Sequence, residues 1–147
     1  MIKGDEKVDG DIKRIINYFG NRDEVSALFV FGSFAKEKLT EESDIDIAVL
    51  IDQTKLEKKN HNRLEKEYYD ASPTFSLRPI DIVILNTAPP FLKHQILRTG
   101  RVLFDRNRRL RVRFTARAIM EYLDFKPLQD IMLKGVADRF RRARIGR

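Results

Sequence analysis

The first apolar pattern along the chain is helical. In residues 8–19 the apolar side chains recur every three or four positions, so they share one face of a helix. Asp9 or Asp11 suits the cap of its first turn, because a short carboxylate accepts hydrogen bonds from free backbone N–H groups. Gly20, followed by asparagine, is typical of a helix end. We therefore expect an N-terminal amphipathic helix.

Four later segments predict the strands of a small sheet. Residues 25–31 and 45–51 are short, mostly apolar and rich in β-forming residues, which indicates buried strands. Residues 80–85 have a similar composition and predict a third strand. Residues 101–104 are a candidate for a short strand at the edge of the sheet.

The segments between these strands predict helices. Residues 54–70 are highly charged and are expected to be helical, with a break at Pro73. Pro90 stands at a position typical of a helix start, and Gly100 ends the same segment. Helices and strands thus alternate, which is typical of a mixed α/β domain.

The C-terminal third predicts two further helices. Asp105 is a candidate cap of a long helix, and Pro127 is expected to separate that helix from a last one, because proline lacks the N–H of the helical ladder. Each of the two carries apolar residues at helical spacing. They are Val112, Ala116, Ile119, Met120 and Leu123 in the first helix, and Leu128, Ile131, Met132, Val136 and Phe140 in the second.

The chain of 147 residues fits a single domain, residues 1–147, with an α/β core over about 8–104 and a helical part over about 105–147. No apolar run reaches the length of a transmembrane helix, and the N-terminus is polar and acidic, unlike a signal peptide. The sequence has no cysteine, which excludes disulfides and thiolate metal sites. These features predict a cytoplasmic protein.

Charge is distributed unevenly. Residues 1–92 hold 13 Lys and Arg against 17 Asp and Glu, whereas residues 93–147 hold 16 against 5, in a chain whose net charge is +7. A segment this basic indicates contact with an acidic protein, nucleic acid or nucleotide phosphates, or a helix with solvated arginines. The arginine cluster over 106–117 fits either interpretation, and no RNA-binding motif accompanies it. His61 and His94, the two histidines, lie in expected helices and are interpreted as solvated.

Asp44 and Asp46 stand at the start of the second expected strand. Because successive strand residues point to opposite faces, these two carboxylates project from the same face. Like charges at this spacing repel unless a cation lies between them, and Mg²⁺ is held by carboxylates together with substrate phosphates. Asp81 precedes the third apolar run in the same way. A third carboxylate on a neighbouring strand would complete a two-metal site.

The Gly32-Ser33 turn ends the first expected strand, and ten residues separate it from Asp44. Glycine lets the backbone approach a phosphate, exposed N–H groups bind anions, and the Ser33 hydroxyl adds a donor. Each motif alone is typical of ordinary turns and strand ends. In this order and combination they predict attack on a nucleoside triphosphate.

The string GSFAKEKLTEESDIDIAVL resembles the signature of the polymerase-β-type nucleotidyltransferase superfamily, and in particular its minimal nucleotidyltransferases. The segments ILRTGRVLFDR and EYLDFKP are similar to the same branch, whereas residues 54–78 match nothing in it. The resemblance implies the polymerase-β-like nucleotidyltransferase fold, an α/β (α+β) structure with a short mixed sheet flanked by helices and with C-terminal helices.

The same resemblance implies roles for individual residues. Asp44, Asp46 and Asp81 are expected to hold two Mg²⁺ ions, and Gly32 and Ser33 to hold the triphosphate. The implied reaction is nucleotidyl transfer, in which a hydroxyl attacks the α-phosphorus of ATP and pyrophosphate leaves. Asp81 is expected to lie nearest the nucleophile and to accept its proton.

Many minimal nucleotidyltransferases are antitoxins that adenylylate a tyrosine of a HEPN-domain ribonuclease toxin encoded beside them. The size of this chain and its EYLDF segment resemble those antitoxins, so the resemblance implies a HEPN toxin as partner. Two alternatives stay open. One is a same-fold enzyme acting on RNA or a small hydroxylated molecule, and the other is a non-catalytic antitoxin that neutralises its partner by binding.

Overall fold

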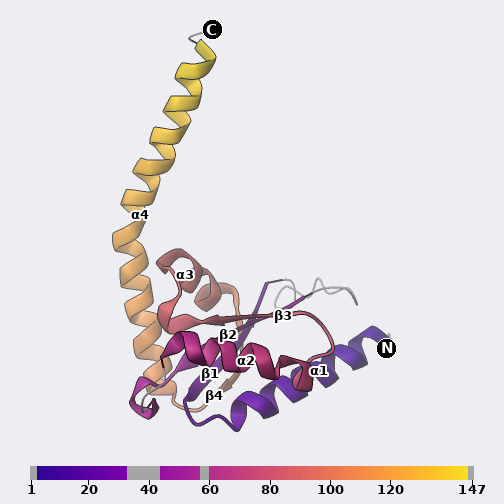
Figure 1. Ribbon diagram of the computed structural model, residues 1–147. Coiled ribbons are helices and arrows are strands. Elements are labelled where there is room, and N and C mark those ends of the chain that lie inside the picture. Colours follow the sequence, from indigo (N-terminus) through magenta and orange to yellow (C-terminus); the bar gives the residue numbers. More distant parts are fainter. Residues whose placement is uncertain (1–2, 33–43, 57–59, 146–147) are drawn as a thin grey trace.

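The computed structural model describes residues 3–32, 44–56 and 60–145. Within these ranges a four-stranded sheet lies between helices on both faces, and one long helix extends beyond it (Figure 1). No helix of the described part is long and apolar enough to cross a membrane. The elements in chain order are α1 (Lys3–Gly20), β1 (Val25–Phe31), β2 (Ile45–Ile51), the 3₁₀ turn η1 (Gln53–Lys55), α2 (His61–Phe75), β3 (Ile80–Ile84), the 3₁₀ turn η2 (Leu85–Thr87), α3 (Pro90–Thr99), β4 (Arg101–Asp105) and α4 (Arg108–Ile145).

The sheet has the strand order β3-β2-β1-β4. β1 runs antiparallel to β2 and to β4, whereas β2 and β3 are parallel. The four predicted strands are therefore confirmed to within a residue at their ends, and β4 lies at an edge as expected. Because β1 and β2 are central and covered on both faces, nearly every residue in them is buried, which explains their continuous apolar sequences.

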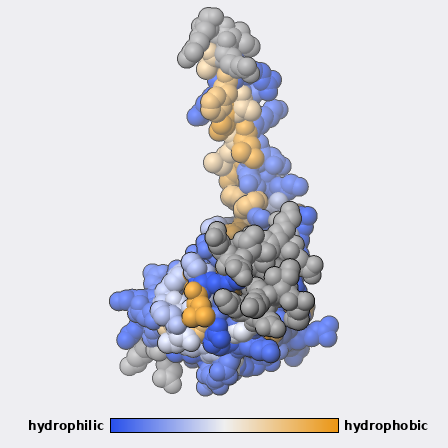
Figure 2. Space-filling model, turned by 90° about the vertical axis from the view of Figure 1, so that its right-hand side faces the viewer, coloured by the Kyte–Doolittle hydropathy of each residue, from blue (hydrophilic) through white to orange (hydrophobic). Residues whose placement is uncertain are grey.

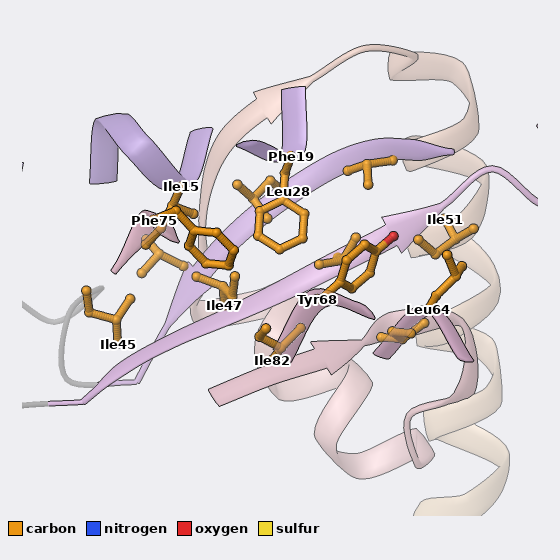
Figure 3. Close-up of a cluster of buried hydrophobic side chains, with 14 residues drawn as sticks. Ile15, Phe19, Leu28, Ile45, Ile47, Ile51, Leu64, Tyr68, Phe75 and Ile82 are labelled. Carbon is orange, nitrogen blue, oxygen red and sulfur yellow. The ribbon is translucent and has the colours of Figure 1, made fainter. Parts of the chain in front are cut away.

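Each face of the sheet carries its own apolar core, because successive strand residues point to opposite faces. One face packs against α1 and α2 (Figure 3), and the other packs against α3 and the beginning of α4. In β2, Ile45 and Ile47 belong to the first core, whereas Ala48 and Leu50 belong to the second. This division fixes the face from which each polar residue of β2 projects.

The cap predicted at the start of the first helix is wrong, although the end at Gly20 is confirmed. α1 already begins at Lys3, so Asp11 lies in its interior and is buried. Its carboxylate pairs with Arg14 and accepts a hydrogen bond from the backbone N–H of Leu77 at 3.3 Å. A buried carboxylate needs such partners, and the hydrogen bond from Leu77 connects α1 to the segment before β3.

The helix predicted over 54–70 is only partly correct. The described chain forms η1 first, and α2 then runs through Pro73 to Phe75, so the expected break there is wrong. Proline removes the N–H that would bond the carbonyl four residues earlier, which belongs to Tyr69. The Ser72 hydroxyl donates to that carbonyl at 2.8 Å. The helix continues because a neighbouring side chain replaces the missing donor.

The two helices predicted after residue 105 are one helix. Asp105 ends β4 and its carboxylate pairs with Arg111, while the Asn107 side chain accepts the N–H of Leu110 and occupies the capping position instead. α4 then runs through Pro127 without ending. Pro127 lies on an exposed stretch, where water can hydrate the one carbonyl that the proline leaves free. The predicted separation is therefore wrong.

The face of α4 that packs on the sheet differs from the expected one. Leu110 and Phe114 pack against the second core, and Ala118, a further four residues along the helix, is buried. The expected stripe that includes Val112 and Leu123 is exposed on another side of the helix. Both patterns have helical spacing, so only the position of α3 decides which of them is buried.

Candidate active site

The pairing of β2 with β3 brings two of the three predicted carboxylates together. In the parallel register Asp46 is the partner of Asp81, and Ile45 is the partner of Ile80. Asp44 directly precedes β2 and is exposed. Parallel neighbouring strands begin at the same end of a sheet. The apolar residues of β2 and β3 set the register of the pair, and this register brings the two carboxylates together at that end.

Both paired carboxylates leave the sheet on the face that α3 and α4 cover. Asp46 alternates with Ile45 and Ile47, which point toward α1 and α2, so it shares the other face with Ala48. By the same alternation Asp81 shares that face with Val83. The site therefore lies on the α3 and α4 side of the sheet, at the edge where β2 and β3 begin.

Gly32 directly follows β1 and lies next to the carboxylate of Asp46. Its φ of +69° lies in the left-handed region, which favours glycine. A Cβ atom at this position would lie 2.3 Å from Oδ2 of Asp46, which no real contact allows. Glycine is thus needed because the Asp46 carboxylate lies against the backbone of the turn. Ser33, the other residue predicted for this turn, lies outside the described residues.

The electrostatics of the site are dominated by like charge. Burial comes first, followed by the charge and hydrogen bond of Asp81 and the charge of Asp44, and together they raise the pKa of Asp46 to about 6. The ionised site is therefore under repulsion that a bound cation relieves.

The donor set fits a hard divalent cation in part. Among the residues that the structure describes, no group of three or more His, Cys, Asp or Glu side chains is placed to hold a metal ion. The structure thus brings Asp46 and Asp81 together, while Asp44 acts on Asp46 through its charge. Mg²⁺ is usually bound by one or two carboxylates together with substrate phosphates. Asp46 and Asp81, with the backbone of Gly32 beside them, meet that requirement.

Tyr69 supports this site from α2, and the sequence did not reveal that role. β3 is an edge strand, so backbone groups on its outer side lack a strand partner. The Tyr69 hydroxyl accepts the N–H of Ile82 at 2.9 Å and donates to the carbonyl of Ile82 at 3.3 Å. Tyr69 thereby fixes the backbone next to Asp81. It belongs to the segment 54–78, in which no motif was recognised, and its only signal is a tyrosine pair in a helix.

Other candidates from the sequence have structural roles. The His94 ring stacks on Tyr122 with ring centroids 3.9 Å apart, so it joins α3 to α4 and is half-buried, contrary to the expected solvated position. His61, the first residue of α2, is half-buried as well. In the arginine cluster, Arg106 donates to backbone carbonyls of the turn after α1, and Arg111 pairs with Asp105.

The four-stranded mixed sheet, its flanking helices and the C-terminal helix agree with the polymerase-β-like nucleotidyltransferase fold that the sequence resemblance implied. The chain belongs to the family described as polymerase beta nucleotidyltransferase, whose model matches residues 13–109. A search of the curated proteins found no match.

Several solved structures with a similar fold are toxin–antitoxin complexes. A chain in the crystal structure of a toxin–antitoxin with AMP-PNP is 25% identical, with a TM-score of 0.68 over 86% of this chain and 98% of that one. A chain of the MntA–HepT toxin–antitoxin is 24% identical, with a TM-score of 0.62 over 86% and 97%. A chain from a tri-AMPylated Shewanella oneidensis HEPN toxin in complex with an MNT antitoxin is 24% identical, with a TM-score of 0.63 over 86% and 96%. The chain thus resembles the minimal nucleotidyltransferase antitoxins, as its sequence indicated.

Proposed function

We propose that this protein is an antitoxin that transfers AMP from ATP to a tyrosine hydroxyl of a HEPN-domain toxin. The observation that carries the proposal is the pairing of Asp46 with Asp81 against the left-handed turn at Gly32. The family of the chain supplies the reaction class, and the complexes that its structural neighbours form supply the class of partner.

The proposed reaction requires a hydroxyl, a triphosphate and divalent cations at one sheet edge. Asp46 and Asp81 would hold Mg²⁺, with Asp44 beside them, and the turn at Gly32 and Ser33 would bind the phosphates. Bound Mg²⁺ would lower the pKa of the attacking hydroxyl and neutralise charge on the phosphates. The tyrosine oxygen forms a bond to the α-phosphorus, the bond from that phosphorus to the pyrophosphate oxygen breaks, and Asp81 accepts the tyrosine proton.

The test uses α-labelled ATP, Mg²⁺ and the purified HEPN-domain toxin of the same host. The wild-type protein should label the toxin, and mass spectrometry should find AMP on a tyrosine. The double variant Asp44→Asn/Asp46→Asn should lose at least about a hundredfold in rate, because the charges that position the cation are gone.

A matched control keeps the change in charge but moves it away from the sheet. Asp124→Asn/Asp130→Asn removes two exposed carboxylates of α4 and should label the toxin like the wild type. Equal activity of the wild type and the double variant at the site would contradict the proposed catalysis. A toxin that both proteins neutralise without label would indicate a binding antitoxin, and label on RNA or on a small molecule would indicate a different acceptor.

A further inference from the structure

The outer half of α4 carries an apolar surface that the described chain leaves uncovered. Leu128, Met132, Val136 and Phe140 form what we call the outer stripe, and Phe140 is 71% exposed. Figure 2 shows apolar residues in a nearly continuous band along the extended part of this helix. Soluble proteins rarely leave large apolar side chains in such a row unless the surface binds something.

The outer stripe continues the face on which α4 already packs. Leu110 and Phe114 pack against the second core, Ala118 is buried, and Tyr122 on the next turn stacks on His94 of α3. Steps of three or four residues along a helix stay on one face, and such steps lead from Tyr122 through Phe125 to Leu128 and then along the outer stripe. Beyond α3, this packing face has no element of the described chain against it (Figure 1). The stripe is thus an unoccupied continuation of an existing helix interface.

This surface faces the same way as the candidate active site. The carboxylates of Asp46 and Asp81 leave the sheet on the side of α3 and α4. β2 and β3 begin at the right-hand side of Figure 1, and Figure 2 looks onto that side and shows the apolar band directed toward the viewer. A protein held against the outer stripe would therefore extend over the edge where the carboxylates gather.

Charge indicates what kind of surface the stripe accepts. α4 holds eleven Lys and Arg against four Asp and Glu, a balance equal to the +7 of the whole chain. By helical position Arg139 lies within the stripe, and Lys126 and Arg142 lie at its borders. Two copies of this helix would bring like charges together, whereas an acidic partner would be attracted.

We infer that the outer stripe docks the protein that accepts the nucleotidyl group. The acceptor would contribute an apolar helical surface that is bordered by Asp and Glu. This inference rests on the proposed function, because the occupant is the substrate of that reaction. A tyrosine side chain alone offers few contacts, and holding it in line with the α-phosphorus requires a larger docking surface. The stripe provides that surface on the face where the transfer would occur.

The test compares two neighbouring residues of one helical turn. Met132 belongs to the stripe and is 61% exposed, and Ile131 is 68% exposed on another side of the helix. Met132→Glu and Ile131→Glu add the same charge at similarly exposed positions. With α-labelled ATP and the purified HEPN-domain toxin of the same host, Met132→Glu should raise the KM for the toxin about tenfold or more, whereas Ile131→Glu should stay close to the wild type. The KM for ATP should be the same in all three proteins.

The outcomes separate this inference from the proposed function. If the wild type labels the toxin and both variants label it equally well, the inference is overturned and the proposed function stands. If the wild type labels no protein, the proposed function fails and the docking inference fails with it. If light scattering shows a dimer of the wild type that Met132→Glu dissociates and Ile131→Glu does not, the occupant is a second copy of the chain and the inference is overturned.

Discussion

At the scale of single residues, Gly32 and Asp46 constrain each other. The left-handed backbone of Gly32 favours glycine by itself, and the 2.3 Å approach of Asp46 Oδ2 to the place of a Cβ means that any side chain there would displace the Asp46 carboxylate. The turn that is predicted to bind phosphate thus also lies against the Asp46 carboxylate. Both the left-handed backbone and the position of that carboxylate favour a residue without a Cβ at position 32.

Gly32→Ala should therefore destabilise the protein and abolish transfer. The left-handed conformation costs about 1–2 kcal/mol for alanine, and displacement of Asp46 adds to it, so we expect a drop in Tm of about 5 °C or more. Gly20→Ala is the control, because a Cβ there meets nothing within 4 Å. Thermal unfolding by circular dichroism measures both variants. Equal Tm values for the two would contradict the close approach of Asp46 to the turn.

Asp46→Asn should stabilise the protein in the absence of divalent cations. Because the folded-state pKa of Asp46 is raised to about 6, the stability contributed by its proton is complete below pH 4 and is lost as the pH rises through about 6. The asparagine variant does not undergo that loss. At pH 8 its free energy of unfolding should exceed that of the wild type by about 1 kcal/mol, after allowance for solvent screening. Thermal unfolding in EDTA should give Asp46→Asn a higher Tm than the wild type at pH 8. At pH 3.5 the two Tm values should be the same. A lower Tm at pH 8 would show that the charge is stabilised.

At the scale of elements, the candidate site depends on how β3 is held. Its inner side pairs with β2, and its outer side is held at Ile82 by the hydroxyl of Tyr69. Tyr68, the preceding residue of α2, is buried in the first core and donates to Glu24 at 3.1 Å. The two neighbouring hydroxyls thus support different parts of the fold.

Tyr69→Phe and Tyr68→Phe should separate positioning from stability. Each variant loses one hydroxyl and about 1 kcal/mol of folding free energy, because a hydrogen-bonded partner remains without it. Only Tyr69→Phe should lower the rate of nucleotidyl transfer, by about tenfold, because it loosens the backbone beside Asp81. Tm and kcat measured together check this. A rate loss in Tyr68→Phe equal to that in Tyr69→Phe would attribute the effect to stability alone.

At the scale of the whole molecule, α4 has two different halves. Its first turns pack on α3 and on the second core, whereas the side chains after Pro127 are mostly exposed. Stability of the domain depends on the first half, because burial of apolar surface is what stabilises a fold. The outer half contributes mostly exposed surface, so we expect it to matter for binding a partner and not for the stability of the domain.

Truncation after Phe125 should leave the domain folded and impair its action on a protein. Because the removed side chains are mostly exposed, we expect Tm to change by less than about 3 °C. Labelling of the HEPN-domain toxin should fall about tenfold or more, in line with loss of a docking surface. Circular dichroism and the labelling assay give the two readings. A fall in Tm of more than about 10 °C would show that the outer half stabilises the domain.

The sequence by itself determined the strands and the identity of the carboxylates. β1, β2, β3 and β4 follow from short apolar runs, because a buried strand needs apolar residues on both faces. Asp46 and Asp81 were predicted as site residues because carboxylates at the starts of two apolar strands, together with the Gly32-Ser33 turn, suit a metal ion and a triphosphate. The helix boundaries near Pro73 and Pro127 were predicted wrongly, since the local rule for proline says nothing about a replacement donor or an exposed helix.

Only the tertiary structure decided which of these features meet. The parallel register sets Asp46 opposite Asp81, the Asp46 carboxylate occupies the space that a side chain at position 32 would need, and Tyr69 reaches β3 from a helix. It also decided which stripe of α4 is buried, because both have helical spacing and α3 covers one of them. Periodicity encodes a face, whereas the partner of that face depends on contacts between residues far apart in the chain.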